Sequence, residues 1–172
     1  MPAIKSAKFD TPLGNVMVMT DDTSLYFLEF CESLGFSKRL QRFEKKIAST
    51  TITPGSTPAT ELIKKELEQY FAGTLKEFKI PLTLFGTPFQ KQVWASLSKI
   101  PFGETLSYSG LAEAIGHPQA CRAVANANGR NHISIVIPCH RVIQQNGLLG
   151  GYGGGKDRKQ RLLDLEGAHY FL

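Results

Sequence analysis

A cysteine, a histidine and an arginine stand in a row one residue after the most apolar run of the chain, Ile133–Ile137. This run predicts a buried strand that Pro138 ends, because proline has no N–H to donate to a sheet ladder. Cys139 is then expected at the mouth of the strand and not deep inside a sheet. The neighbouring His140 and Arg141 favour its thiolate, which is the form that attacks electrophilic carbon. The stretch therefore predicts a nucleophilic thiol.

A histidine that acts as a base usually has a carboxylate on its second ring nitrogen. Glu166 is the candidate, in the last turn of a helix expected over about residues 156–166 and just before Gly167. A carboxylate there faces the negative end of the helix dipole, which favours a compensating cation; an ordinary surface glutamate has the same spacing. In an extended segment Cys139 and His140 point to opposite sides, so His140 would reach the thiol through a water or a turn of backbone.

Neither a metal site nor a nucleotide site is expected. The three cysteines contain no Cys-x-x-Cys pair, and no cluster of Cys and His has the spacing of zinc ligands. The stretch Gly150–Lys156 nearly satisfies the phosphate-loop pattern, but Asp157 stands where magnesium needs a hydroxyl. We therefore expect no cofactor, and the glycines predict a mobile or closely approached loop beside the thiol.

The charge of the chain is concentrated in its second half. Residues 86–172 carry nine Lys/Arg and five Asp/Glu, a net charge of +4, whereas residues 1–85 carry eleven and ten, a net charge of +1. This excess fits an anionic partner such as nucleic acid. No apolar run has the length of a membrane span, and the N-terminus lacks the apolar core of a secretory signal. A cytoplasmic protein without membrane contact is therefore expected.

The first half of the chain predicts a small α/β domain over residues 1–82. Residues 7–30 alternate as three short strands with breaks at 11–14 and 21–23, which is typical of a β-meander. Apolar residues at helical spacing predict helices over 35–48 and from the N-cap Thr57 to Gly73. Residues 80–86 are the expected linker.

The second half, residues 86–172, predicts a mostly helical domain. A capping box at Thr87 and Gln90 begins one helix. Two short helices over about 107–115 and 119–128 flank a Gly-containing turn, which is the outline of a helix-turn-helix and also of a generic helical hairpin. The second of these helices is rich in alanine, and its one cation, Arg122, could enter a base stack or simply face water.

Taken together, these residues resemble the O6-alkylguanine-DNA alkyltransferase family of direct-reversal DNA repair proteins, in its bacterial constitutive form. The resemblance is carried by blocks in family order: TPFQKQVW, IPFGETLSYSGLAEAIGHP, RAVANANGRN, IPCHRVI and YGGGKDRKQRLLDLEG. It implies an α+β fold, with a ribonuclease-H-like N-terminal domain and a C-terminal winged helix-turn-helix domain that carries the cysteine.

The resemblance also implies a reaction and the residues that perform it. The protein would flip O6-alkylguanine out of double-stranded DNA from the minor groove and move the alkyl group irreversibly to Cys139, once per molecule, without an obligate protein partner; O4-alkylthymine is an open second substrate. The implied catalytic residues are Cys139, His140, Glu166, Tyr108 and Asn131. Those implied to bind DNA are Arg122, Ala123, Ala127, Tyr108 and Ser107. Those implied to form the substrate pocket are Val142, Tyr152, Gly153 and Gly154.

Gly153 departs from some relatives, which have serine there, so we expect a roomier pocket.

Two other function classes remain open. In a non-catalytic DNA-binding module, the basic second half would bind DNA and Cys139 would be an unreactive core thiol. The reactivity of the thiol therefore distinguishes such a module from an alkyltransferase. A cysteine hydrolase built on Cys139, His140 and Glu166 would turn over repeatedly, although adjacent Cys and His give it poor geometry.

Overall fold

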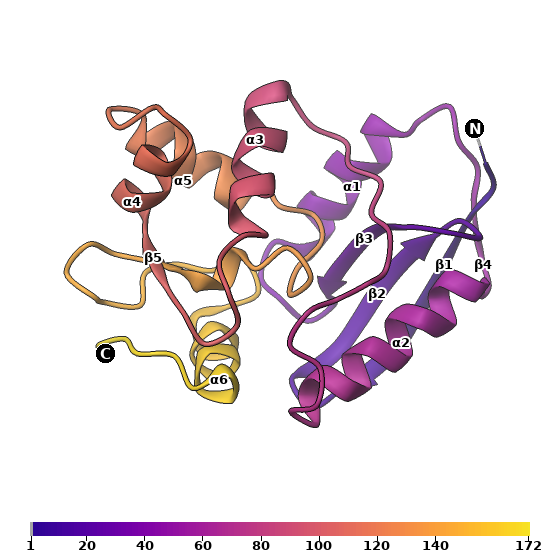
Figure 1. Cartoon of the computed structure of the whole chain (residues 1–172). Coiled ribbons are helices and arrows are strands. Elements are labelled where there is room, and N and C mark those ends of the chain that lie inside the picture. Colours follow the sequence, from indigo (N-terminus) through magenta and orange to yellow (C-terminus); the bar gives the residue numbers. More distant parts are fainter. Residues whose placement is uncertain (1) are drawn as a thin grey trace. The chain divides into compact units, whose positions relative to one another are not determined.

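A computed structural model describes residues 2–172, and the chain divides into two compact units that meet in sequence between Phe85 and Gly86. The first unit is a sheet with helices, and the second is mostly helical (Figure 1). The predicted α+β class is thereby confirmed. Within the described residues, no helix has the length and apolar character needed to cross a membrane.

The first unit contains the predicted meander and one strand that was not expected. The strands are β1 (Ile4–Thr11), β2 (Gly14–Thr20), β3 (Leu25–Phe30) and β4 (Ile52–Pro54). Their order in the sheet is β3-β2-β1-β4; β1 pairs antiparallel with β2 and β2 with β3, whereas β4 runs parallel to β1. The sequence of β4 falls in a segment that its Thr, Pro, Gly and Ser content predicted to be a loop. It adds three residues to the edge of the sheet.

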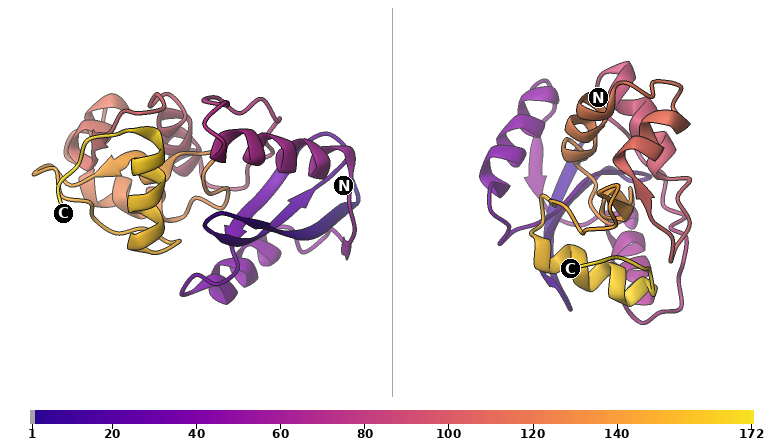
Figure 2. Two further views of the ribbon diagram at one scale, coloured as in Figure 1. Left: turned by 90° about the horizontal axis from the view of Figure 1, so that it is seen from below. Right: turned by 90° about the vertical axis from the view of Figure 1, so that its left-hand side faces the viewer.

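Helices α1 (Phe36–Lys46) and α2 (Pro58–Phe71) cover opposite faces of this sheet (Figure 2). Every residue of β3 is buried, as expected for a strand packed on both sides. Helix α2 begins as predicted: the Thr57 hydroxyl accepts a hydrogen bond from the Thr60 N–H, and Pro58 occupies the first turn.

The second unit consists of short helices around a two-strand ladder. Its elements are α3 (Pro88–Leu97), β5 (Leu106–Ser107), α4 (Tyr108–Ala114), α5 (Cys121–Gly129), the 3-10 helix η1 (Cys139–Arg141), β6 (Val142–Ile143) and α6 (Lys156–Glu166). β5 and β6 are parallel. The predicted capping box of α3 is present, with Thr87 and Gln90 bonded to each other's backbone N–H. Trp94 is fully buried, and its indole N–H donates to the Ala127 carbonyl, which ties α3 to α5.

The strand predicted over Ile133–Ile137 is wrong, because this segment is a series of turns. The Asn131 side chain takes over the backbone bonding that a neighbouring strand would otherwise supply: its amide donates to the Ile133 and Ile137 carbonyls, and its oxygen accepts from the Ile133 N–H. Ile135 adopts a φ of 72°, which a β-branched residue rarely does, and the Val136 N–H donates to the Ser134 carbonyl across it. The three isoleucines of the run are buried, as predicted, but in a tighter path than a strand.

Candidate active site

Cys139 is the first residue of η1 and is buried, with 7 % of its surface exposed. Its backbone N–H donates to the Ile137 carbonyl across Pro138, and Asn131 holds the same carbonyl from the other side. The 3-10 turn directs successive side chains about 120° apart. Cys139 and His140 therefore diverge without being opposed, unlike the extended geometry that the sequence suggested.

His140, Glu166 and Arg141 form one buried cluster. His140 Nε2 lies 2.8 Å from Oε2 of Glu166, and both side chains have no exposed surface. Arg141 binds the same carboxylate with two N–H groups, Nε to Oε1 at 2.8 Å and Nη2 to Oε2 at 3.0 Å, and its third bond goes to the Ile100 carbonyl. A carboxylate at a helix C-terminus is stabilised by a nearby cation, and Arg141 is that cation for Glu166.

The protonation states of this cluster follow from burial and from these bonds. Burial lowers the pKa of His140, and although Glu166 opposes that shift, the net direction favours the neutral ring. Burial alone would raise the pKa of Glu166, but bonds and charges from His140 and Arg141 outweigh it and hold that pKa at about 2. The carboxylate and the guanidinium therefore neutralise each other, and His140 is available as a base. Its Nδ1 is buried and, within residues 2–172, accepts or donates no hydrogen bond.

Lys159 is a site residue that the sequence analysis missed. It is fully buried in α6, and its ammonium donates to the carbonyls of Val142 at 2.6 Å and Gly151 at 3.1 Å. Burial lowers the pKa of Lys159 to about 8, although negative charge on Cys139 acts in the opposite direction. Its spacing from Leu163 and Glu166 along α6 places it on their inward face. That spacing is the signal that could have revealed it.

Tyr108 and Tyr152 border the same region. Tyr108 begins α4, and burial, together with negative charge at Cys139, raises its pKa. The Tyr152 ring packs edge-on against His140, with 6.5 Å between the ring centroids. A Cβ placed on Gly150 would lie 3.7 Å from Nζ of Lys159 and 3.8 Å from Cε2 of Tyr108. Both are ordinary van der Waals distances, so the φ of 73° and not a close approach favours glycine at position 150.

The remaining predicted pocket residues differ in exposure. Val142 is buried and forms the β5–β6 ladder with Leu106. Gly153 is exposed, whereas Gly154 is buried and accepts a hydrogen bond from Arg158 through its carbonyl. Ser107 is half-buried as the N-cap of α4 and accepts from the Gly110 N–H.

Helix α5 presents one exposed face and one buried face. Arg122 and Ala123 are exposed, together with Asn126 and Arg130, which share their face at helical spacing. Ala127 differs from the other predicted DNA-binding residues of α5: it is only 3 % exposed and packs inward beside Trp94. The alanines of α5 thus lie on both faces of the helix, Ala127 in the packed core and Ala123 on the exposed surface.

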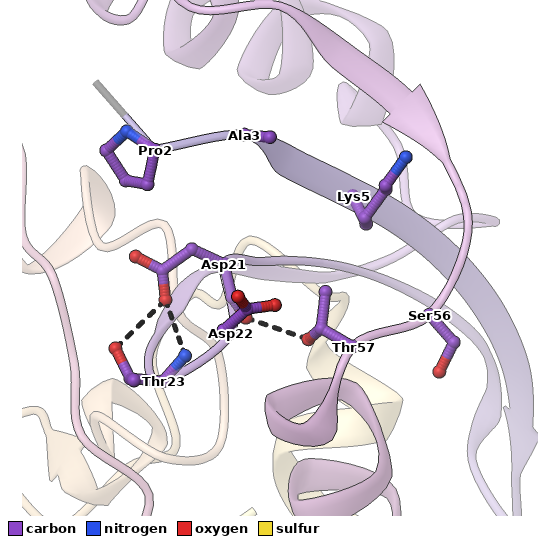
Figure 3. Close-up of a pocket in the computed structure, with 8 residues that line it drawn as sticks. All are labelled: Pro2, Ala3, Lys5, Asp21, Asp22, Thr23, Ser56 and Thr57. Atoms are coloured by element: carbon purple, nitrogen blue, oxygen red, sulfur yellow. Dashed lines mark hydrogen bonds between the residues drawn. The ribbon is translucent and has the colours of Figure 1, made fainter.

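A pocket of about 330 Å³ in the first unit has no comparable chemistry (Figure 3). The Asp21 carboxylate, which lines this pocket, accepts hydrogen bonds from Thr23, Ser24 and Tyr26. These bonds stabilise a turn. Across residues 2–172, no group of three or more His, Cys, Asp and Glu is arranged to hold a metal ion. The buried cluster around Cys139 is therefore the candidate site.

Comparisons with known proteins identify the family of the chain. Residues 4–84 match the ribonuclease-like domain of 6-O-methylguanine DNA methyltransferase, and residues 88–168 match its DNA binding domain. The chain is 41 % identical to a methylated-DNA–protein-cysteine methyltransferase of Methanosarcina acetivorans, over 94 % of this chain and 97 % of the relative. It is 40 % identical to the constitutive protein of Bacillus subtilis, over 94 % of each chain.

Solved structures give the same result. The crystal structure of the Mycobacterium tuberculosis O6-methylguanine methyltransferase superposes with a TM-score of 0.80 at 41 % identity, covering 95 % of this chain and 93 % of that one. The Mycobacterium tuberculosis protein in complex with DNA also superposes with a TM-score of 0.80 at 41 % identity, covering 96 % and 92 %. On this evidence the chain belongs to the 6-O-methylguanine DNA methyltransferase family, the methylated-DNA–protein-cysteine methyltransferases.

Proposed function

We propose that this protein repairs double-stranded DNA by direct reversal, moving the alkyl group from O6 of a guanine to Sγ of Cys139. The observation that carries the proposal is the buried neutral His140, bonded to Glu166 through Nε2 and next to Cys139 in the sequence. The family membership adds the substrate class, and the second unit's match to a DNA binding domain adds the partner.

The reaction is a displacement at the alkyl carbon. His140 takes the proton of the Cys139 thiol, through Nδ1 and one bridging water, while Glu166 holds the ring in place. The thiolate forms the new S–C bond as the C–O6 bond breaks, and the electron pair stays with the guanine. Tyr108, whose raised pKa keeps its hydroxyl protonated, donates the proton that the guanine needs, and solvent returns the proton of His140 to Tyr108.

The substrate must leave the base stack to reach a thiol that is 7 % exposed. Flipping a nucleotide costs a few kcal/mol, and a side chain that fills the gap offsets part of that cost. Arg122 is exposed on α5 and fits this role, while Asn126 and Arg130 on the same face fit contacts to the DNA backbone.

The product is a thioether, which His140 as a base cannot cleave. One protein molecule therefore accepts one alkyl group and stops. A cysteine hydrolase with the same residues would instead release product repeatedly.

A stoichiometry experiment tests the proposal. A duplex with one radiolabelled O6-methylguanine is mixed with limiting wild-type protein or with Cys139→Ser. We expect label to accumulate on the wild-type protein up to one methyl group per molecule and then stop, with none on Cys139→Ser. Continued release of label into solution would establish a hydrolase, and binding without any transfer would establish a non-catalytic DNA-binding module.

A further inference from the structure

The C-terminal residues 168–172 follow the site helix α6 and return to the glycine-rich loop. Gly167 ends α6 with a φ of 69° and turns the chain back. The Phe171 N–H then donates to the Gly147 carbonyl at 2.7 Å, and Phe171 and Leu148 form a parallel bridge. We call residues 168–172 the tail and residues 144–155 the wall loop.

Side chains reinforce this backbone contact. Ala168 and Tyr170 of the tail pack against a buried apolar cluster of Ile143, Leu149 and Leu163. Leu149 belongs to the wall loop and is 1 % exposed. The tail thus joins the loop to α6 through apolar contact as well as through one hydrogen bond.

Gly147 permits the approach of the Phe171 ring. A Cβ on Gly147 would lie 2.5 Å from Cδ2 of Phe171, and Gly147 has a φ of 84°. Only glycine meets both conditions without strain. The turn Gln144–Leu148 is closed by hydrogen bonds between Gln144 and both Gly147 and Leu148.

The same loop also contacts two residues of the candidate site, Lys159 and His140. Three positions after Gly147, a Cβ placed on Gly150 would lie within 4 Å of Tyr108 and Lys159. The Gly151 carbonyl accepts from Lys159, and the Tyr152 ring packs on His140. Lys159 therefore fixes the middle of the wall loop, and the tail fixes its beginning.

We propose that the tail is a strap that holds the wall loop against the acceptor site, and that it thereby limits the size of the alkyl group that Cys139 accepts. The second part of this inference rests on the proposed function. Without the strap, the first half of the loop keeps its own turn and the packing of Leu149 on Ile143 and Leu163, but it loses the contacts with the tail. The wall then moves more and yields to bulkier groups.

The test compares three variants: a truncation after His169, Phe171→Ala, and the control Leu172→Ala, which changes a side chain that is 81 % exposed. The first readout is hydrogen exchange of peptides covering residues 144–155, with α3 of the same unit as the internal reference for folding. The second is the ratio of transfer rates from duplexes that contain O6-benzylguanine or O6-methylguanine. Wild-type protein is measured beside each variant.

We expect exchange of the wall loop to increase in the truncation, to increase less in Phe171→Ala and to be unchanged in Leu172→Ala. We expect the benzyl-to-methyl ratio to rise about threefold or more in the truncation, a modest share of what one pocket contact can discriminate. If the truncated protein fails to fold, Phe171→Ala carries both readouts.

Unchanged exchange in the truncation would overturn the strap, whatever the transfer rates. Increased exchange with an unchanged ratio would overturn its role in size selection. If the wild-type protein transfers neither group, the proposed function fails and the size selection fails with it, whereas the exchange result still decides whether the strap exists.

Discussion

Arg141 holds both carboxylate oxygens of Glu166, and His140 shares one of them. Because a carboxylate and a guanidinium cancel, and because burial favours neutral His140, this cluster brings little net charge to Cys139. The charged group left to stabilise a thiolate is the buried ammonium of Lys159. The sequence suggested that Arg141 would stabilise the thiolate, whereas in the structure Arg141 serves Glu166.

The first prediction concerns Lys159. Lys159→Met should slow methyl transfer at pH 7 by about 10²-fold, the order of effect of removing one electrostatic contact from a site. In the wild-type protein the ammonium is present below its pKa of about 8 and is lost above it. The transfer rate should therefore fall between pH 8 and pH 9.5, and the variant should lack this fall. A wild-type rate that keeps rising over this range, as for an ordinary thiol, would contradict the role.

Glu166 should make the stability of the second unit sensitive to acid. Its pKa is lowered from 4.5 to about 2 in the fold, so its contribution is complete above pH 4.5 and is lost as the pH falls toward 2. The shift corresponds to about 3 kcal/mol. We expect the stability difference between wild type and Glu166→Gln, measured by urea unfolding, to be largest at pH 7 and to shrink below pH 4.5. A difference that stays constant with pH would argue against an ionised Glu166.

Arg122 should affect the rate of alkyl transfer only when the alkylated guanine lies in a DNA duplex. Arg122→Ala removes the exposed side chain that we propose to fill the gap left by the flipped base. Transfer from duplex DNA should therefore slow by about 10-fold to 100-fold, equivalent to about 1.4 to 2.7 kcal/mol. Transfer from free O6-benzylguanine should not change. Arg161→Ala, which removes an exposed cation from α6, is the matched control. Equal slowing on both substrates would place Arg122 in the fold or in the chemistry instead.

The capping box of α3 gives a prediction on stability alone. Thr87→Ala should lower the free energy of unfolding of the second unit by about 1 kcal/mol, because it leaves the Gln90 N–H without its acceptor. Lys91→Ala, an exposed change in the same helix, should alter it by less than about 0.5 kcal/mol. Trp94 is the single tryptophan of the chain and lies in α3, so its fluorescence follows the unfolding. Equal effects of the two changes would contradict the cap.

Local signals explain which elements could be predicted from the sequence. Helices α2 and α3 begin at the predicted N-caps, and α6 covers the predicted Lys156–Glu166, because capping side chains, Pro58 and Pro88, and Gly167 act on their own neighbours. The three strands of the meander follow from alternation and from turns. These features depend on residues within one or two turns of each other.

The features that could not be predicted depend on partners far away in the sequence or on the packing of a whole helix. The Ile133–Ile137 run has the composition of a strand, but Asn131 bonds to its backbone and directs it into turns. Strand β4 has only three residues and exists because the edge of β1 is available. Ala127 is buried because Trp94 packs beside it, which alanine content alone does not indicate.

Some features of the candidate site could likewise be predicted from the sequence, and others could not. The adjacency of Cys139 and His140 and the choice of Glu166 as partner could be read from the sequence, and the structure places His140 and Glu166 2.8 Å apart. The bidentate hold of Arg141 and the burial of Lys159 needed the three-dimensional arrangement. Both features depend on α6, which begins about 15 residues after the η1 turn in the sequence and packs against it in the fold.

The most direct test of the account is peptide mapping by mass spectrometry after incubation with a duplex that holds one O6-methylguanine. The chain offers three cysteines, of which Cys31 and Cys121 are internal controls. We predict a single methyl group, located on Cys139 and on neither of the others. A methyl group on Cys31 or Cys121, or an unmodified protein that still binds the lesion duplex, would contradict the assignment of Cys139 as the acceptor.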